Sequence, residues 1–258
     1  MFEKLDAMPT APIALIAALP EEIKPLLAKM DIVKEELISG FTLYRCRLGD
    51  RELILLRSGM GPKNAEEAVR ALLKIVTPER IINFGLGGAV APGLRVADLA
   101  LATRLLVSDG GKFREQSGLT LPLVEGFAAV AANKDCLYGT FITAAETMPK
   151  AALHRALPAG TETPILEMET AAIARVADEH KIPLLAIRAV SDDCNEELGF
   201  TVAEFCDANL RIRPLKVLLT ILKRPWIVPQ LFRLARNSRQ AAEALAACII
   251  TYLEQSHA

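Results

Sequence analysis

The sequence is poor in the residues that hold metal ions and disulfide bonds. Its 258 residues include only three histidines, which lie far apart, and five cysteines. No two cysteines form a CxxC pair, and their number is odd (Cys46, Cys136, Cys194, Cys206 and Cys248). Zinc sites and disulfide frameworks need closely spaced ligands or paired thiols. We therefore expect no metal site, no disulfide framework, and reduced thiols, as is usual in a cytoplasm.

Long apolar runs are also missing. The first apolar segment, Ile13–Leu19, stops at Pro20-Glu21-Glu22, and the acidic residues Glu3 and Asp6 precede it, unlike the start of a signal peptide. No uninterrupted apolar stretch is long enough to span a bilayer. These patterns predict a cytoplasmic protein without a transmembrane segment.

The chain carries almost no net charge overall, but its charges are unevenly distributed along the sequence. The net charge of −1 gives no bias towards nucleic acid, so we expect no nucleic-acid partner. The C-terminal region, 208–242, nevertheless has no acidic residue, and it carries eight basic ones: Arg211, Arg213, Lys216, Lys223, Arg224, Arg233, Arg236 and Arg239. The rest of the chain, with 22 basic and 31 acidic residues, carries −9. We therefore divide the chain into a main domain, 1–207, and a basic C-terminal extension, 208–258, packed on it.

Apolar residues make up 52% of the chain, enough for a sizeable core. Apolar runs such as Leu184–Ile187 are typical of parallel strands buried on both faces. Such runs alternate with helical patterns, while 41–47 and 51–57 flank a turn and predict a hairpin. The alternation predicts an α/β fold with a mixed, mostly parallel sheet covered by helices.

Carboxylates lie where this pattern places ligand sites. Glu167 and Glu169 precede a predicted helix, and Asp192 ends a buried strand. Glu22 follows another strand, although an acid in the first turn of a helix is ordinarily a solvated partner of the helix dipole. Since ligands bind at the carboxyl ends of strands in open α/β sheets, we expect these acids to meet at one pocket. Arg188, inside an apolar strand, needs a buried carboxylate partner, and structural pairing is its expected role.

Two glycine-rich segments also follow strands, Ser58-Gly59-Met60-Gly61 and Gly85-Leu86-Gly87-Gly88. The second is not a dinucleotide fingerprint, because Val90 stands at the third glycine position. We therefore expect no cofactor, and we interpret the segment as a backbone turn that approaches a ligand closely.

Five motifs in register, spread from about Ile13 to Phe205, resemble the nucleoside phosphorylase/nucleosidase superfamily. The order and spacing look most like methylthioadenosine/S-adenosylhomocysteine nucleosidases. The resemblance implies a three-layer α/β/α sandwich around a mixed, partly barrel-like sheet, and cleavage of the N-ribosyl bond of a purine nucleoside. The motifs are Ile13–Glu22, Ser58–Gly61, Ile82–Gly85, Leu166–Glu169 and Arg188–Asp192.

The same resemblance implies roles for individual residues. Asp192 would protonate or hydrogen-bond the purine at N7, and Glu22 would polarise an attacking water. Glu169 would hold the ribose hydroxyls, with Met168 packed on the sugar. Further expected contacts to the substrate come from Glu167, Ser58, Gly59, Met60, Gly85, Leu86, Gly87 and Ser191. An acid is needed at the base and negative charge near the ribose because cleavage passes through an oxocarbenium-like state.

Three departures from the superfamily pattern bear on the reaction. Leu86 stands where phosphorylases have a serine, and Asn83 where many have an arginine, which favours water over phosphate as the nucleophile. The aromatic residue that nucleosidases stack on the purine would fall near Thr147-Met148, and neither is aromatic.

The basic extension affects the expected substrate. Pro214–Lys223 has amphipathic helical spacing, and Trp226 stands between two prolines. Segment 211–239 could contact the inner membrane face peripherally, or form helices packed on the domain or across a dimer. The extension looks like that of the hopanoid-associated phosphorylase branch, which releases adenine from adenosylhopane.

We therefore expect a nucleosidase of a small or lipid-linked adenine nucleoside, most simply a homodimer. The alternatives are an ordinary methylthioadenosine/S-adenosylhomocysteine nucleosidase, a futalosine-type hydrolase, or a non-catalytic nucleoside-binding protein. Retention of Glu22, Glu169 and Asp192 together argues against the last.

Overall fold

The computed structural model describes residues 11–130, 136–145, 149–196, 202–207, 210 and 213–256. Strands and helices alternate through most of the chain. In order they are β1 (Ile13–Ala17), α1 (Pro20–Leu27), β2 (Asp31–Ile38), β3 (Phe41–Leu48), β4 (Arg51–Arg57), α2 (Pro62–Leu73), β5 (Arg80–Ala89), β6 (Leu99–Asp109), β7 (Lys112–Glu115), α3 (Leu121–Val130), β8 (Cys136–Ala144), α4 (Lys150–Ala156), β9 (Ile165–Glu167), α5 (Thr170–Glu179), β10 (Leu184–Asp192), α6 (Val202–Phe205), α7 (Pro214–Lys223), the 3₁₀ turn η1 (Pro225–Ile227) and α8 (Val228–Gln255).

The strands form one mixed sheet of ten strands, part of which closes on itself. Strands β4, β1, β5 and β10 lie side by side in this order and run parallel to one another. From β10 the sheet continues through β6, β8 and β9 and returns to β5, which also pairs with β10. These five strands form a closed barrel, and β4, β3 and β2 extend from it on the far side of β1.

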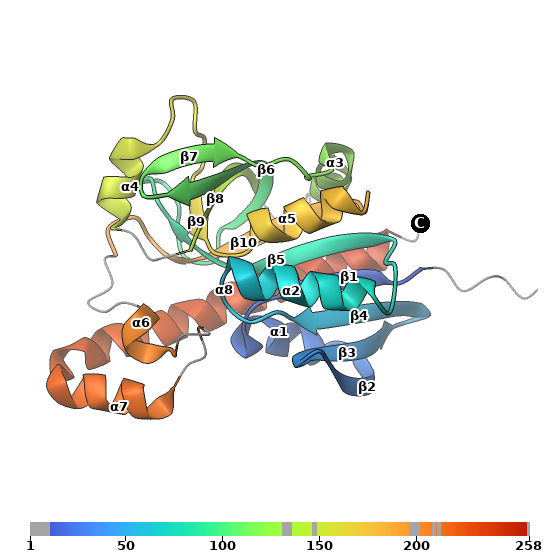
Figure 1. The fold of residues 1–258 in the computed structure, drawn as a ribbon, viewed down its shortest axis with the longest axis horizontal. Helices are drawn as coiled ribbons and strands as arrows, with labels where there is room; N and C mark the ends of the chain where they lie inside the picture. Colours follow the sequence, from blue (N-terminus) through green and yellow to red (C-terminus); the bar gives the residue numbers. More distant parts are fainter. Residues whose placement is uncertain are drawn as a thin grey trace, which may run out of the picture.

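Two apolar layers bury the two faces of the sheet. In β1, Ile13 and Leu15 belong to one cluster with residues of α1, α3 and the end of α8, while Ala14 and Ile16 belong to another with residues of α2 and α5. This alternation follows from the two-residue period of a strand, so an unbroken apolar run faces helices on both sides. Figure 1 shows α2 and α5 on one side of the strands and α8 on the other. The expected three-layer fold with a partly barrel-like sheet is confirmed.

Several local predictions need correction. The predicted hairpin is confirmed as β3 and β4, but Gly85–Gly88 is not a turn, because β5 runs through it to Ala89. Strand β7, which pairs with β6, was not predicted from the sequence, and neither were β2 and α4.

The C-terminal region divides within α8. Its second half belongs to the core, since Leu245, Ile249 and Tyr252 are at most 3% exposed. The predicted amphipathic segment is helix α7, and Figure 1 shows α7 and the first half of α8 projecting away from the sheet. Among the described helices, none is both long and apolar enough to cross a membrane.

Candidate functional site

Glu22 lies at the start of α1 with its carboxylate turned back into the protein. Pro20 occupies the first helical position, where its missing N–H costs no hydrogen bond. The Oε2 atom of Glu22 accepts hydrogen bonds from the backbone N–H groups of Ala18 at 2.9 Å and Leu19 at 2.8 Å. Its Oε1 atom accepts one from Leu86 of β5, also at 2.8 Å. Burial raises the pKa of Glu22, although these backbone donors oppose the shift. A solvated partner of the helix dipole would be exposed, so that interpretation of Glu22 is wrong.

Glu169 is a second buried carboxyl group beside the first. Its Oε1 atom accepts a 2.8 Å hydrogen bond from the N–H group of Gly61, which precedes α2. Gly61 has a φ of 89°, a conformation that favours glycine. Burial, and then the charges of Glu167 and Glu22, raise the pKa of Glu169 to about 8. A carboxyl group with this pKa is mostly protonated at pH 7, and it can take either state near neutrality.

Glu167 has a different environment from its neighbour. It forms a buried ion pair with Arg188, whose Nη2 atom lies 2.7 Å from Glu167 Oε2. Thr143 donates to its other oxygen, and the N–H groups of Glu169 and Thr170 donate to Oε2 at 3.0 and 2.8 Å. Burial opposes ionisation of Glu167, but Arg188 and these donors outweigh it, so its pKa is lowered. The expected structural pairing of Arg188 is confirmed, and Glu167 is the carboxylate that satisfies it.

Asn83 belongs to the same network. Its Oδ1 atom accepts from Arg188 Nη2 and from the Thr170 hydroxyl, both at 2.9 Å, and its Nδ2 atom donates to the carbonyl oxygen of Ile16. The side chain is 1% exposed. Asn83 of β5 therefore links β1 and β10 through its side-chain hydrogen bonds.

The glycines of β5 make room for the carboxylates. A Cβ atom on Gly85 would lie 2.6 Å from Glu22 Oε1, and one on Gly88 would lie 2.8 Å from Asp192 Oδ2. Both distances are shorter than real Cβ contacts, so a side chain at either position would displace a carboxylate. Gly85–Gly88 was predicted to be a ligand-binding turn. It is instead part of a strand, and Gly85 and Gly88 leave room for the carboxylates of Glu22 and Asp192.

Asp192 ends β10, opposite Gly88 in the sheet. Its Oδ1 atom accepts a hydrogen bond from the Ser191 hydroxyl, and its Oδ2 atom forms an ion pair with Lys150 of α4. Ser191 was predicted as a substrate contact, and in the structure its hydroxyl reaches Asp192 and the carbonyl oxygen of Gly87. Sequence reasoning missed Lys150, which lies 42 residues before Asp192.

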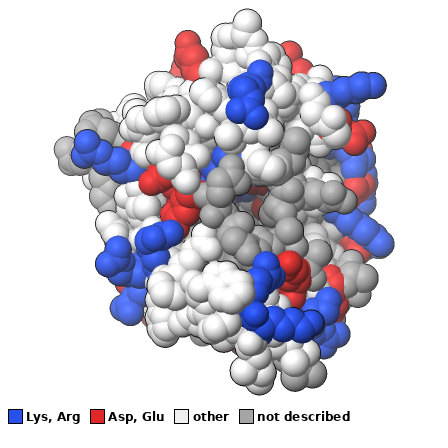
Figure 2. Space-filling view, turned by 90° about the vertical axis from the view of Figure 1, so that its left-hand side faces the viewer, with Lys and Arg blue, Asp and Glu red and all other residues white. Residues whose placement is uncertain are grey.

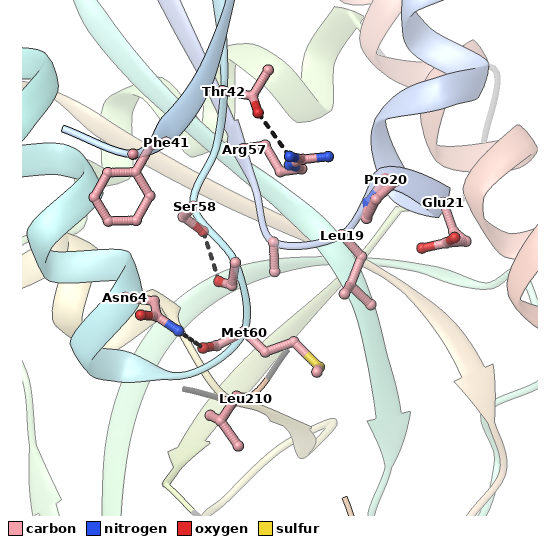
Figure 3. Close-up of a pocket in the computed structure, with 13 residues that line it drawn as sticks. Leu19, Pro20, Glu21, Phe41, Thr42, Arg57, Ser58, Met60, Asn64 and Leu210 are labelled. Atoms are coloured by element: carbon pink, nitrogen blue, oxygen red, sulfur yellow. Dashed lines mark hydrogen bonds between the residues drawn. The ribbon is translucent and has the colours of Figure 1, made fainter. Parts of the chain in front are cut away.

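A cavity of about 590 Å³ opens beside the start of α1, and Glu22, Glu169 and Asp192 are not among the residues that line it. Ala18 and Leu19, whose N–H groups hold Glu22, line it, and so do Ser58, Gly59 and Met60. In Figure 3, Leu19, Met60 and Leu210 gather towards one end, while Phe41, Thr42 and Arg57 lie at the other. Arg57 donates to the Thr42 hydroxyl at 2.7 Å. The cavity is therefore lined by apolar side chains at one end, and by Phe41 together with the polar Thr42 and Arg57 at the other.

The acids were predicted to meet at one pocket. The contacts in the structure support only part of that prediction. Glu22 and Asp192 both reach β5, and the charge of Glu22 acts on Glu169. Met168 lies half-buried between two buried glutamates. Leu86 contributes its backbone N–H to Glu22, and Gly87 is covered by Ile165 and Arg188. Thr147 and Met148, the expected place of a stacking residue, lie outside the described residues.

Comparison with known proteins gives a consistent result. The profile of the phosphorylase superfamily matches residues 12–223. A 5'-methylthioadenosine/S-adenosylhomocysteine nucleosidase of Listeria monocytogenes is 31% identical over 213 residues, which cover 75% of this chain and 91% of the relative. One from Bacillus thuringiensis is 29% identical over 211 residues, covering 76% and 91%.

Solved structures share the fold at lower identity. The Helicobacter pylori 5'-methylthioadenosine/S-adenosyl homocysteine nucleosidase superposes with a TM-score of 0.74 at 17% identity, covering 96% of this chain and all of that one. The futalosine hydrolase of the same organism gives 0.72 at 16%, covering 95% and 98%. The S-adenosylhomocysteine nucleosidase of Streptococcus pyogenes, in complex with 5-methylthiotubericidin, gives 0.72 at 24%, covering 96% and 98%.

Proposed function

The chain belongs to the phosphorylase superfamily, and we propose that it is a nucleosidase that hydrolyses the N-glycosidic bond of an adenine nucleoside. The observation that carries the proposal is the arrangement of Glu22, Glu169 and Asp192 around the end of β5. Gly85 and Gly88, which face Glu22 and Asp192, are three residues apart, roughly 10 Å along a strand. Both carboxylates therefore lie against β5, and we assign one to the sugar and the other to the base of one nucleoside.

We assign a separate step to each acid. Asp192 donates a proton to N7 of the base as the C1′–N9 bond breaks and its electron pair leaves with the base. Glu22, whose raised pKa is typical of a general base, takes a proton from the water that attacks C1′. Glu169 binds the ribose hydroxyls, and the developing cation on the sugar favours its charged form.

Water is the proposed nucleophile. Leu86 offers a possible anion only its backbone N–H, and that donor is already bound to Glu22. Asn83 is buried in hydrogen bonds to Arg188 and Thr170. Neither residue supplies the charge or the hydroxyl with which a phosphate would be held.

The cavity supports a bulky, apolar 5′ substituent. Leu19 and Met60 line its apolar end beside the N–H groups that hold Glu22, and Leu210 lines the same end. Adenosylhopane, a lipid-linked adenine nucleoside, has such a substituent. We therefore propose it as the substrate, in the service of hopanoid biosynthesis.

A matching apolar surface lies at the projecting end of α7 and α8. We define the docking surface as the exposed side chains Leu218, Leu219, Leu222, Trp226 and Phe232, each 47–74% exposed. Figure 2, which faces this side of the molecule, shows a white area low on the face with Lys and Arg side chains beside it. Exposed apolar groups with basic neighbours are typical of elements that insert into the interfacial region of a membrane.

The basic residues of this region contribute less charge than their number indicates. Within the described residues, Arg213, Arg224, Arg233 and Arg239 form ion pairs with Asp207, Glu204, Glu196 and Glu243. Lys223 and Arg236 are exposed, with no such pair among the described residues, and Arg211 lies outside them. We therefore propose that apolar insertion, helped by these two cations, holds the protein on the inner membrane face.

Release of the free base from a panel of nucleosides tests the proposed function. The wild-type enzyme is incubated with adenosylhopane in mixed micelles, methylthioadenosine, S-adenosylhomocysteine and futalosine, and the free base is quantified. We expect the highest kcat/KM with adenosylhopane. Rapid turnover of methylthioadenosine or futalosine, with none of the lipid nucleoside, identifies the nucleosidase or futalosine hydrolase alternative. Binding of adenosine without base release identifies a non-catalytic nucleoside-binding protein.

A further inference from the structure

Lys150 is an almost buried cation that the proposed chemistry has not yet used. It lies at the start of α4, and its side chain is 8% exposed, against 13% for Asp192. Its Nζ atom donates to Asp192 Oδ2, to the carbonyl oxygen of Asp193 at 2.6 Å and to that of Asp192 at 3.3 Å. An ammonium group has three N–H donors. All three are therefore directed at the segment that carries the proposed acid.

The other oxygen of Asp192 is held as well. The Ser191 hydroxyl lies 2.5 Å from Oδ1. The backbone of Gly88 closes a third side, since an added Cβ atom there would lie 3.2 Å from Lys150 Nζ and 2.8 Å from Asp192 Oδ2. The carboxylate of Asp192 is thus held in one orientation from both oxygens and from the strand beside it.

A buried ion pair is weak evidence of a role in stability, because desolvation offsets much of the attraction between the charges. Orientation is a different matter, since misplacing a reacting group by about 1 Å can cost roughly 10²-fold in rate. We propose that Lys150 is a positioning residue that orients Asp192 towards the departing base. The inference rests on the proposed nucleosidase function and adds a residue to it.

The proton balance of this step is simple. The proton moves from the Asp192 carboxyl group to N7, the electron pair of the C1′–N9 bond passes to the base, and Asp192 is left as a carboxylate. The ammonium group of Lys150 stabilises that carboxylate through its hydrogen bond. Glu22 releases to solvent the proton that it took from the attacking water, and solvent returns a proton to Asp192 before the next turnover.

The test compares Lys150→Met with wild type in adenine release from methylthioadenosine or the best substrate of the panel. Lys74→Met, which removes an exposed lysine at the end of α2, is the matched control. We expect kcat of Lys150→Met to fall by about 10²-fold, KM to change by less than about threefold, and the control to match wild type. Lys150→Gln, which keeps N–H donors but not the charge, is a second variant in case the first fails to fold.

A second substrate separates positioning from general damage. The base of an N7-methylated adenine nucleoside is already cationic and needs no proton to depart. The loss on that substrate should therefore be much smaller for both Lys150 variants and for Asp192→Asn. Wild-type kcat in a folded Lys150 variant, or an equal loss on both substrates, overturns the inference. Absence of adenine release by the wild-type enzyme from every nucleoside would instead overturn the proposed function itself.

Discussion

Arg188 and Glu167 form a buried ion pair, with Arg188 Nη2 2.7 Å from Glu167 Oε2 and both side chains at most 2% exposed. The pair joins β10 to β9, and the backbone N–H of Glu169 also donates to Glu167. It also explains why the pKa values of these two glutamates, separated by one residue, shift in opposite directions. Arg188 stabilises the charged form of Glu167 and lowers its pKa, while the pKa of Glu169 is raised.

Breaking this pair should destabilise the fold strongly. Arg188→Met leaves the Glu167 carboxylate buried without its cation, which costs about 3–5 kcal/mol in the free energy of unfolding. Arg175→Met is the matched control, because the Arg175–Glu66 pair is partly exposed and such pairs contribute about 1 kcal/mol or less. Urea denaturation of the three proteins measures the difference. Equal stability of the two variants would show that the buried pair is not important for the fold.

Glu169 should make stability depend on pH. Its pKa in the folded protein, about 8, lies above the ordinary 4.5, so the folded state binds the extra proton between these values. The free energy of unfolding should therefore fall as the pH rises from about 5 to 8. Glu169→Gln should remove a part of this fall on the order of a few kcal/mol, whereas Glu162→Gln, at an exposed site, should not. Denaturation curves at several pH values give the comparison, and parallel curves for Glu169→Gln and wild type would contradict the assignment.

Gly85→Ala should disable the site without unfolding the protein. The new Cβ atom would lie 2.6 Å from Glu22 Oε1 and force the carboxylate away from the Leu86 N–H. We expect adenine release to fall by at least about 10-fold, since general-base catalysis contributes roughly 10²–10⁴-fold. Gly126→Ala in α3, where no atom lies within 4 Å of the new Cβ, is the control and should keep full activity. Full activity in Gly85→Ala would mean that the position of Glu22 does not matter.

The docking surface predicts binding to anionic lipid. Removing residues after 207 would also delete the core residues Leu245, Ile249 and Tyr252, so point substitutions are the better test. Wild type should sediment with phosphatidylglycerol vesicles, and replacement of Leu222, Trp226 and Phe232 by serine should abolish this. Leu37→Ser, at a residue 73% exposed on β2, should not.

Charge should make a smaller contribution than apolar insertion. Lys223→Glu and Arg236→Glu should each weaken binding to anionic vesicles, because each cation near such a surface contributes about 1 kcal/mol to the binding free energy. A wild-type protein that stays in the supernatant at low salt contradicts the membrane proposal. A change of oligomeric state in the serine variant, without any lipid binding by wild type, would identify the surface as a contact between copies of this chain.

The sequence predicted the fold better than the details of the site. Apolar runs and helical spacing identified the buried strands and the hairpin, because local periodicity reports which faces are covered. It could not predict that Gly85–Gly88 continues as a strand, since glycine is equally compatible with turns. Lys150 was missed because its partnership with Asp192 depends on a contact between segments 42 residues apart. The structural role of Asn83 likewise arises only from the packing of three strands.

Hydrolysis in ¹⁸O-labelled water tests the central claim most directly. The wild-type enzyme and Asp192→Asn are incubated with the best adenine nucleoside, with and without phosphate, and the products are analysed by mass spectrometry. We predict free adenine and a sugar product carrying one ¹⁸O atom, no acceleration by phosphate, and a rate about 10²–10⁴-fold lower in Asp192→Asn. A ribose 1-phosphate product, or turnover in Asp192→Asn close to that of wild type, would contradict the account.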